Sequence, residues 1–204
     1  MASARPRLIV FTDTTRADAP VMLERFEALA ERAEPDRVLF TLRDYALPVR
    51  QRWGLGERLA ELTRRTQQRF GIAERADLAR GFGCTAFHLP QHGLSVADAR
   101  AYLGGQVWLS SGCHELAVAP TAGLDAVLLS PIFETRKGRP ALGVGALARA
   151  SAAHPGHAWF ALGGADASNA AACLASGATG VAVIGAALAP DPAPLLAALG
   201  ILRG

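Results

Sequence analysis

The sequence predicts an α/β fold, a single (β/α)8 TIM barrel formed by residues 1–204. Short runs rich in β-branched and aromatic residues alternate with helical patterns rich in alanine and leucine, which is typical of parallel β-α units. Eight such runs in 204 residues leave about 25 residues per unit, enough for a compact closed barrel. Three segments, 80–89, 121–130 and 176–185, repeat one plan in which a helix ends at glycine just before a buried strand.

The predicted strands are short apolar runs bounded by glycine, proline or charged residues. In chain order they are RLIVFTD (7–13), RVLFTLRD (37–44), FGIAE (70–74), CTAFHLP (84–90), QVWLSSG (106–112), DAVLLSPI (125–132), HAWFALGG (157–164) and GVAVIGAAL (180–188). The third is the shortest and follows a very polar stretch. Helical patterns with apolar residues three and four apart fill the gaps at 20–33, 56–68, 75–80, 95–103, 114–122, 143–153, 168–177 and 193–200.

An open doubly wound sheet is the alternative fold. Such sheets that bind dinucleotides carry a G-x-G-x-x-G sequence after the first strand, and this chain has FTDTTRADAP there instead. The closed barrel is therefore the preferred prediction.

Composition excludes several classes of function. The net charge is only +3, and acidic residues are interspersed among the arginines, so no surface for nucleic acid is expected. No apolar run approaches the ~20 residues of a membrane span, and no signal peptide is recognisable. The three cysteines are scattered without a CxxC pair and are expected to be reduced thiols. We therefore expect a cytoplasmic location.

Loops after the carboxyl ends of the strands carry function in this fold, often with a phosphate site after strands seven and eight. The seventh strand ends at Gly163 and Gly164, with Ser168 as the expected N-cap of the next helix, and the eighth reaches Gly185. Backbone N–H groups at such glycines can approach a phosphate closely. The alternative is that these glycines only make tight turns.

The loop after the sixth strand, FETRKGRPALG, brings a hydroxyl and three cations together within five residues: Thr135, Arg136, Lys137 and Arg139. Lys137 is the only lysine among 21 basic residues. Because these groups follow directly after a buried strand, we expect this loop to cover a polyanion. An exposed loop that serves only solubility is the alternative.

The segments IVFTD, TLRDYALP, FHLPQHGL, SPIFETRKGRPALG, ALGGADASN and GATGVAVIGAAL, in this order, resemble the thiamine-phosphate synthase and TenI family over nearly the whole chain. The resemblance implies a (β/α)8 barrel of thiamine biosynthesis. Synthases of the family join a pyrimidine methyl diphosphate to thiazole phosphate with Mg²⁺ and release pyrophosphate, and TenI-like members include a thiazole tautomerase.

Carried over by position, the resemblance assigns Thr135 and Lys137 to the loop that binds the diphosphate. Arg43 matches the arginine of the family's Q-L-R-x-K signature. The backbone that holds the thiazole phosphate would be formed by the residues at the ends of strands seven and eight: Gly164, Val183, Ile184 and Gly185.

Several positions depart from the synthase pattern. Thr41 and Tyr45 replace Gln and Lys of the signature, and Ala73 and Glu74 replace its Asn-Asp pair. His92 stands where the second metal-binding acid is found, which leaves Glu74 as the predicted Mg²⁺ ligand. The tautomerase base corresponds to Pro131. Neither activity therefore has its full residue set.

His88 and His114 lie at or just after predicted strand ends, where an imidazole that titrates near pH 7 could act as a general base. A hydrogen-bonded packing role is the alternative for each. His154 and His157 precede the seventh strand, at the opposite end of the barrel, and are expected to be structural.

Three functions remain open at this point. The protein is a diverged synthase, a TenI-like isomerase, or a barrel that binds a phosphorylated thiazole or thiamine-related ligand without catalysis. The sequence does not determine the oligomeric state.

Overall fold

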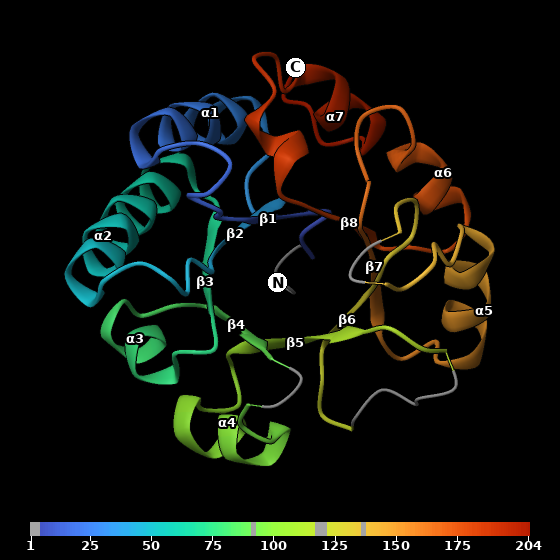
Figure 1. Cartoon of the computed structure of the whole chain (residues 1–204), viewed down its shortest axis with the longest axis horizontal. Coiled ribbons are helices and arrows are strands. Elements are labelled where there is room, and N and C mark those ends of the chain that lie inside the picture. Colours follow the sequence, from blue (N-terminus) through green and yellow to red (C-terminus); the bar gives the residue numbers. More distant parts are fainter. Residues whose placement is uncertain (1–4, 91–92, 117–121, 136–137) are drawn as a thin grey trace.

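The computed structural model describes residues 5–90, 93–116, 122–135 and 138–204, which form a closed barrel of parallel strands in chain order (Figure 1). All eight predicted strands are present, the short third one included. They are β1 (Leu8–Phe11), β2 (Val38–Leu42), β3 (Arg69–Ala73), β4 (Ala86–Leu89), β5 (Trp108–Cys113), β6 (Ala126–Leu129), β7 (Ala158–Leu162) and β8 (Gly180–Val183). β1 pairs with β8 through Leu8 and Val181, and this pairing closes the barrel.

Helices surround the barrel on its outside (Figure 1). They are α1 (Ala19–Arg32), α2 (Val49–Thr66), α3 (Ala76–Gly81), α4 (Val96–Leu103), α5 (Gly145–Ala153), α6 (Ala170–Ala175) and α7 (Ala193–Ala198), with a 3-10 helix η1 (Gly185–Leu188). In the part of the chain that the structure describes, no helix is both long and apolar enough to cross a membrane.

Four local predictions are corrected by the structure. α2 begins at Val49 rather than at residue 56. β8 ends at Val183, and the expected strand residues 185–188 form η1. Asn169, not Ser168, is the N-cap residue of α6, because Ser168 instead donates its backbone N–H and hydroxyl to Asp166. The described residues of the predicted helix at 114–122, namely 114–116 and 122, are not helical.

Side chains alternate between two packed layers along each strand. One set points into the barrel, where Ile9, Phe11, Leu39, Leu128 and Phe160 belong to one buried cluster. The other set packs against the surrounding helices in a larger cluster. Because apolar side chains fill the interior of the barrel, a ligand can approach only at one of its two ends, where the loops are.

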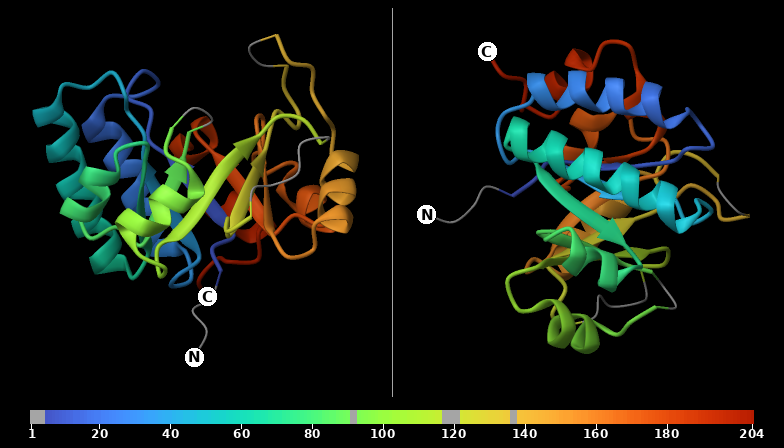
Figure 2. Two further views of the ribbon diagram at one scale, coloured as in Figure 1. Left: turned by 90° about the horizontal axis from the view of Figure 1, so that it is seen from below. Right: turned by 90° about the vertical axis from the view of Figure 1, so that its left-hand side faces the viewer.

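The two ends of the barrel differ. Figure 2 shows both termini at one end, while the described parts of the loop that follows β6 rise at the other. That other end is formed by the carboxyl ends of the parallel strands. It is therefore the end at which residues from several strands can be combined in one site.

Candidate functional site

Two cavities adjoin at the carboxyl end of the barrel. The larger measures about 490 Å³ and is lined by residues at or after the ends of β1, β2, β5, β6, β7 and β8, among them Arg43, His114 and Arg139. The smaller measures about 190 Å³ and lies between the ends of β7 and β8. Leu162, Gly163 and Ile184 line both cavities. Two bound molecules could therefore contact each other at this shared wall.

The smaller cavity brings together the four residues that the sequence predicts for a phosphate cradle: Gly164, Val183, Ile184 and Gly185. Gly164 has a φ of 77°, in the left-handed region that favours glycine. A Cβ there would lie 2.7 Å from Cγ of Glu134 and 2.9 Å from Cβ of Phe133. The backbone of Gly164 is thus covered closely by the loop after β6, and a larger residue would not fit.

Arg16 is a cavity residue that the sequence analysis missed. It comes from the loop after β1 and lines the smaller cavity beside Gly185. The sequence does contain a sign of this role, because in TDTTR (12–16) a cation follows soon after a strand end, as it does after the sixth strand. The position of this loop next to β8 depends on closure of the barrel, which a local pattern does not contain.

Arg43 extends into the larger cavity from the end of β2. Its Nη2 lies 3.1 Å from Oδ2 of Asp13, and its guanidinium carbon lies 5.8 Å from the centre of the Phe11 ring. Its backbone N–H donates to Oγ1 of Thr12 at 2.9 Å. These contacts hold Arg43, the predicted catalytic arginine, in a defined orientation.

Asp13 remains ionised beside these arginines. Burial raises the pKa of Asp13, but hydrogen bonds from Thr15 and the charges of Arg43 and Arg16 outweigh that effect, so the pKa lies below its ordinary value of 3.8. The site therefore contains a permanent carboxylate between two cations.

Asp44 is a second carboxyl group that the sequence analysis missed. It is 8% exposed, and its Oδ1 accepts hydrogen bonds from the backbone N–H and the hydroxyl of Thr14, both at 2.6 Å. Its Oδ2 is buried without a hydrogen-bond partner among the described residues. Asp44 thus ties the loop after β2 to the loop after β1, both of which line the larger cavity.

The two candidate bases occupy different environments. Nδ1 of His114 lies 2.9 Å from the carbonyl oxygen of Ser130 and 3.1 Å from the Oγ of the same residue. Because a carbonyl oxygen can only accept, we assign the proton to Nδ1, which leaves Nε2 as the acceptor nitrogen. His114 lines the larger cavity. This residue remains a candidate base or positioning group.

His88 lies on the inner face of β4, with its Nδ1 3.0 Å from Oγ of Ser110 and its ring against the edge of Phe11. Burial, together with the charge of Arg43, lowers the pKa of His88 from 6.5 to about 4. The expectation that His88 titrates near pH 7 is therefore wrong, because the barrel interior disfavours the charged imidazole. His88 is also not among the residues that line either cavity.

Around the end of β3, Tyr45, Arg52 and Glu74 are close together. Arg52 is 5% exposed, donates from Nη2 to the carbonyl oxygen of Ala73 at 3.1 Å, and lies 5.6 Å from the centre of the Tyr45 ring. Burial, and the nearby charge of Glu74, raise the pKa of Tyr45 above 10.0. A buried arginine therefore lies beside the tyrosine that replaces the family's lysine.

The predicted magnesium ligand is a poor fit. Glu74 is exposed and has a φ of 72°. Within the described ranges, no three His, Cys, Asp or Glu side chains are grouped closely enough to share a metal ion. The described donor set thus does not form a metal site.

The remaining predicted residues belong to the loop after β6. Thr135 is exposed and lines neither cavity. Lys137 and Arg136, like His92, lie outside the described residues. Arg139 is the cation of this loop that the structure places at the larger cavity.

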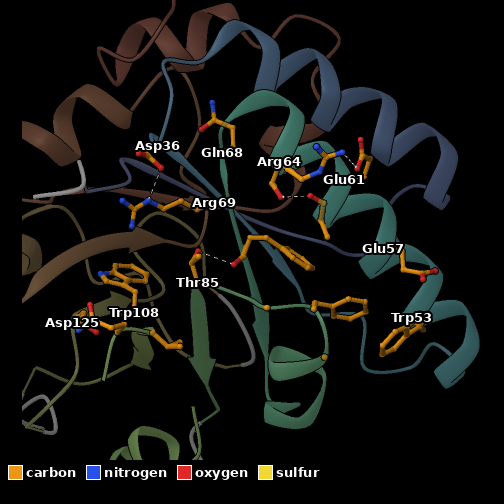
Figure 3. Close-up of a pocket in the computed structure, with 18 of the residues that line it drawn as sticks. Asp36, Trp53, Glu57, Glu61, Arg64, Gln68, Arg69, Thr85, Trp108 and Asp125 are labelled. Atoms are coloured by element: carbon orange, nitrogen blue, oxygen red, sulfur yellow. Dashed lines mark hydrogen bonds and ion pairs between the residues drawn. The ribbon is translucent and has the colours of Figure 1, made fainter. Parts of the chain in front are cut away.

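A more open cavity of about 970 Å³ lies at the opposite end of the barrel and along α2 (Figure 3). Arg69 and Trp108 begin strands there, and Trp53, Glu61 and Arg64 come from α2. Two ion pairs lie in its lining, Arg64–Glu61 at 2.5 Å and Arg69–Asp36 at 3.6 Å. This cavity offers no comparable set of oriented groups, and the site is placed at the carboxyl end.

The sequence of the chain matches those of known proteins. The profile of the thiamine monophosphate synthase family matches residues 8–187. The thiamine-phosphate synthase of Mycolicibacterium paratuberculosis is 33% identical over 195 residues, which cover 89% of this chain and 86% of the relative. That of Thermobifida fusca is 34% identical over 194 residues, covering 91% and 87%.

A solved structure supports the fold. The thiamine phosphate pyrophosphorylase of Pyrococcus furiosus superposes with a TM-score of 0.78 at 23% identity, covering 95% of this chain and 93% of the other. At that identity the likeness establishes the barrel, while the family follows from the sequence matches. On these grounds the chain belongs to the thiamine monophosphate synthase family.

Proposed function

We propose that the protein binds a thiazole phosphate in the smaller cavity and joins it to a pyrimidine methyl diphosphate in the larger one, with release of pyrophosphate. One observation carries the proposal: two cavities of unequal size adjoin through Leu162, Gly163 and Ile184. Two substrates that form a bond must be held side by side, and such positioning supplies much of the rate. The name of the relatives, thiamine-phosphate synthase, agrees with this reaction.

The reaction breaks one bond and forms another. The C–O bond between the pyrimidine methylene and the diphosphate breaks, and pyrophosphate leaves with the electron pair. The lone pair of the thiazole ring nitrogen then forms a C–N bond to the methylene carbon, which gives a thiazolium. No proton is removed in these steps, so the condensation requires no general base. The low pKa of His88 is compatible with this chemistry.

Stabilisation of the leaving charge is the main task of the protein in this mechanism. Arg43 and Arg139 line the larger cavity and are assigned to the pyrophosphate. Arg43 is oriented in advance by Asp13 and Phe11, so little of its freedom is lost when the anion forms. Thr135 and Lys137, from the same loop as Arg139, remain predicted contacts of the diphosphate.

No step of this mechanism passes through Mg²⁺, because Glu74 is exposed and belongs to no group of three possible metal ligands among the described residues. A cytoplasmic location also remains a prediction. The free thiols of Cys84, Cys113 and Cys173 support it, since reduced cysteines are usual in that compartment.

The test is to incubate the protein with both substrates and Mg²⁺ and to measure thiamine phosphate and pyrophosphate. Both products should form in equal amounts. Arg43→Met should lower kcat by roughly 10²- to 10³-fold, as loss of one preorganised charge-stabilising group does in other enzymes. Arg50→Met is the matched control, because Arg50 is an exposed arginine in the first turn of α2.

Two results would contradict the condensation. Binding of thiazole phosphate without any product would support the non-catalytic barrel. Interconversion of thiazole tautomers in the absence of the pyrimidine diphosphate would support the isomerase.

A further inference from the structure

We propose that Arg16 is the residue that selects a phosphate monoester over the corresponding free alcohol in the smaller cavity. This inference rests on the proposed function and adds a specificity residue to it. The sequence patterns assign only backbone groups to this cavity, and Arg16 supplies a side-chain charge.

Contact with the cradle is the first observation. Arg16 lines the smaller cavity, and its Nη1 lies 3.2 Å from the position that a Cβ on Gly185 would occupy. The guanidinium therefore lies close to Gly185, the residue that follows Ile184. Among the described residues that line this cavity, Arg16 is the only cation. A phosphate near Gly185 would meet this guanidinium before any other charged group.

The charge balance of the cavity is the second observation. Glu134 and Asp166 also line it, and both are acidic. Oδ1 of Asp166 already accepts from the backbone N–H of Ser168 at 2.8 Å and from its hydroxyl at 2.6 Å. Without Arg16 the lining would have two negative charges and no described positive one. A dianion would then be repelled, whereas a neutral alcohol would not.

The acidic residues and the arginine lie on opposite sides of the smaller cavity. Cγ and the carboxyl carbon of Glu134 lie over Gly164, at 2.7 and 3.1 Å from the position of an added Cβ. Arg16 lies over Gly185. The cavity is thus negative on the β7 side and positive on the β8 side, and an anion is expected next to Gly185.

Arg16 is tethered loosely enough to turn toward a ligand. Its Nε lies 3.5 Å from Oδ2 of Asp13, and 43% of its side chain is exposed. The same Oδ2 is closer to Nη2 of Arg43, at 3.1 Å. Arg16 can therefore leave Asp13 to bind a phosphate, while the Asp13 carboxylate stays paired with Arg43 at the larger cavity.

Calorimetric titration with thiazole phosphate and with the unphosphorylated thiazole alcohol tests the inference. Arg16→Met should weaken binding of the phosphate by about 10- to 100-fold, the loss expected for a hydrogen bond with a charged partner. Binding of the alcohol and the KM for the pyrimidine diphosphate should change by less than about twofold. Arg16→Lys should restore part of the phosphate affinity, since it returns the charge without the planar fork.

Arg37→Met is the matched control. Arg37 forms a similar ion pair with a residue three positions earlier, with its Nε 3.3 Å from Glu34 and 32% of its side chain exposed. It lies just before β2, at the opposite end of the barrel. This variant removes the same net charge and should leave phosphate binding unchanged.

The outcomes separate the two proposals. Equal loss of phosphate and alcohol binding in Arg16→Met, or unchanged phosphate binding, would overturn the role of Arg16 and leave the proposed function standing. Failure of the wild-type protein to bind thiazole phosphate would overturn both. Glu134→Gln gives an independent check, because removal of the opposing carboxylate should tighten phosphate binding and leave alcohol binding unchanged.

Discussion

His88 makes the stability of this barrel dependent on pH in a way that can be calculated. Its imidazole lies inside the barrel, on β4, and its pKa is lowered from 6.5 to about 4 by burial and by the charge of Arg43. Below pH 6.5 the unfolded chain therefore binds a proton at this position that the folded protein does not. Stability falls as pH falls through this window, because the unfolded state takes up more protons.

The magnitude follows from the two pKa values. The slope approaches about 1.4 kcal/mol per pH unit between them. Relative to neutral pH, the loss amounts to about 2 kcal/mol at pH 5 and about 3 kcal/mol at pH 4, after which the folded protein is protonated as well. For a domain that is stable by 5–15 kcal/mol in general, this is a substantial fraction.

The assay is urea unfolding at several pH values between 7 and 4, for the wild-type protein and for His88→Asn. Asparagine keeps a hydrogen-bonding group near Oγ of Ser110 but does not titrate. Other titrating groups contribute to both proteins, so the difference between the two profiles isolates His88. Parallel profiles would show that His88 is protonated as readily in the folded barrel as in the unfolded chain, and would refute the reasoning.

Three further predictions follow from the site. Gly164→Ala should lower the free energy of unfolding by roughly 1–3 kcal/mol and abolish binding of thiazole phosphate, because the backbone there is left-handed and the new Cβ would lie 2.7 Å from Cγ of Glu134. Gly83→Ala is the control in chemical denaturation, because Gly83 is also left-handed but has open space around it. Arg52→Met should cost about 1.5–3 kcal/mol by removing a charged donor from the carbonyl at the end of β3, whereas exposed Arg50→Met should cost little. Titration calorimetry with Mg²⁺ alone should show no binding, because the described acidic side chains form no group of metal ligands. Affinity for Mg²⁺ should appear only once a diphosphate is present, and tight binding of Mg²⁺ to the free protein would contradict this.

Much of the fold and part of the site could be predicted from the amino-acid sequence alone. Each strand is marked by its own apolar residues, and in the segments 80–89, 121–130 and 176–185 a glycine marks the turn into the strand, so the barrel is predictable from local patterns. Gly164 and Gly185 could be predicted to lie together because they closely follow the ends of two consecutive parallel strands.

Other features depend on contacts that no local pattern contains. Arg16 reaches the cradle only because β1 pairs with β8, which brings the two ends of the chain side by side. His88 lies near the end of its strand, where the sequence pattern predicts a titrating histidine, yet burial on the inner face of β4 and the charge of Arg43 lower its pKa. The sequence by itself determined which strand ends carry glycine and charge. The tertiary structure decided which of those charges share a cavity and which groups stay neutral, since proximity and burial are set by barrel closure and by residues distant along the chain.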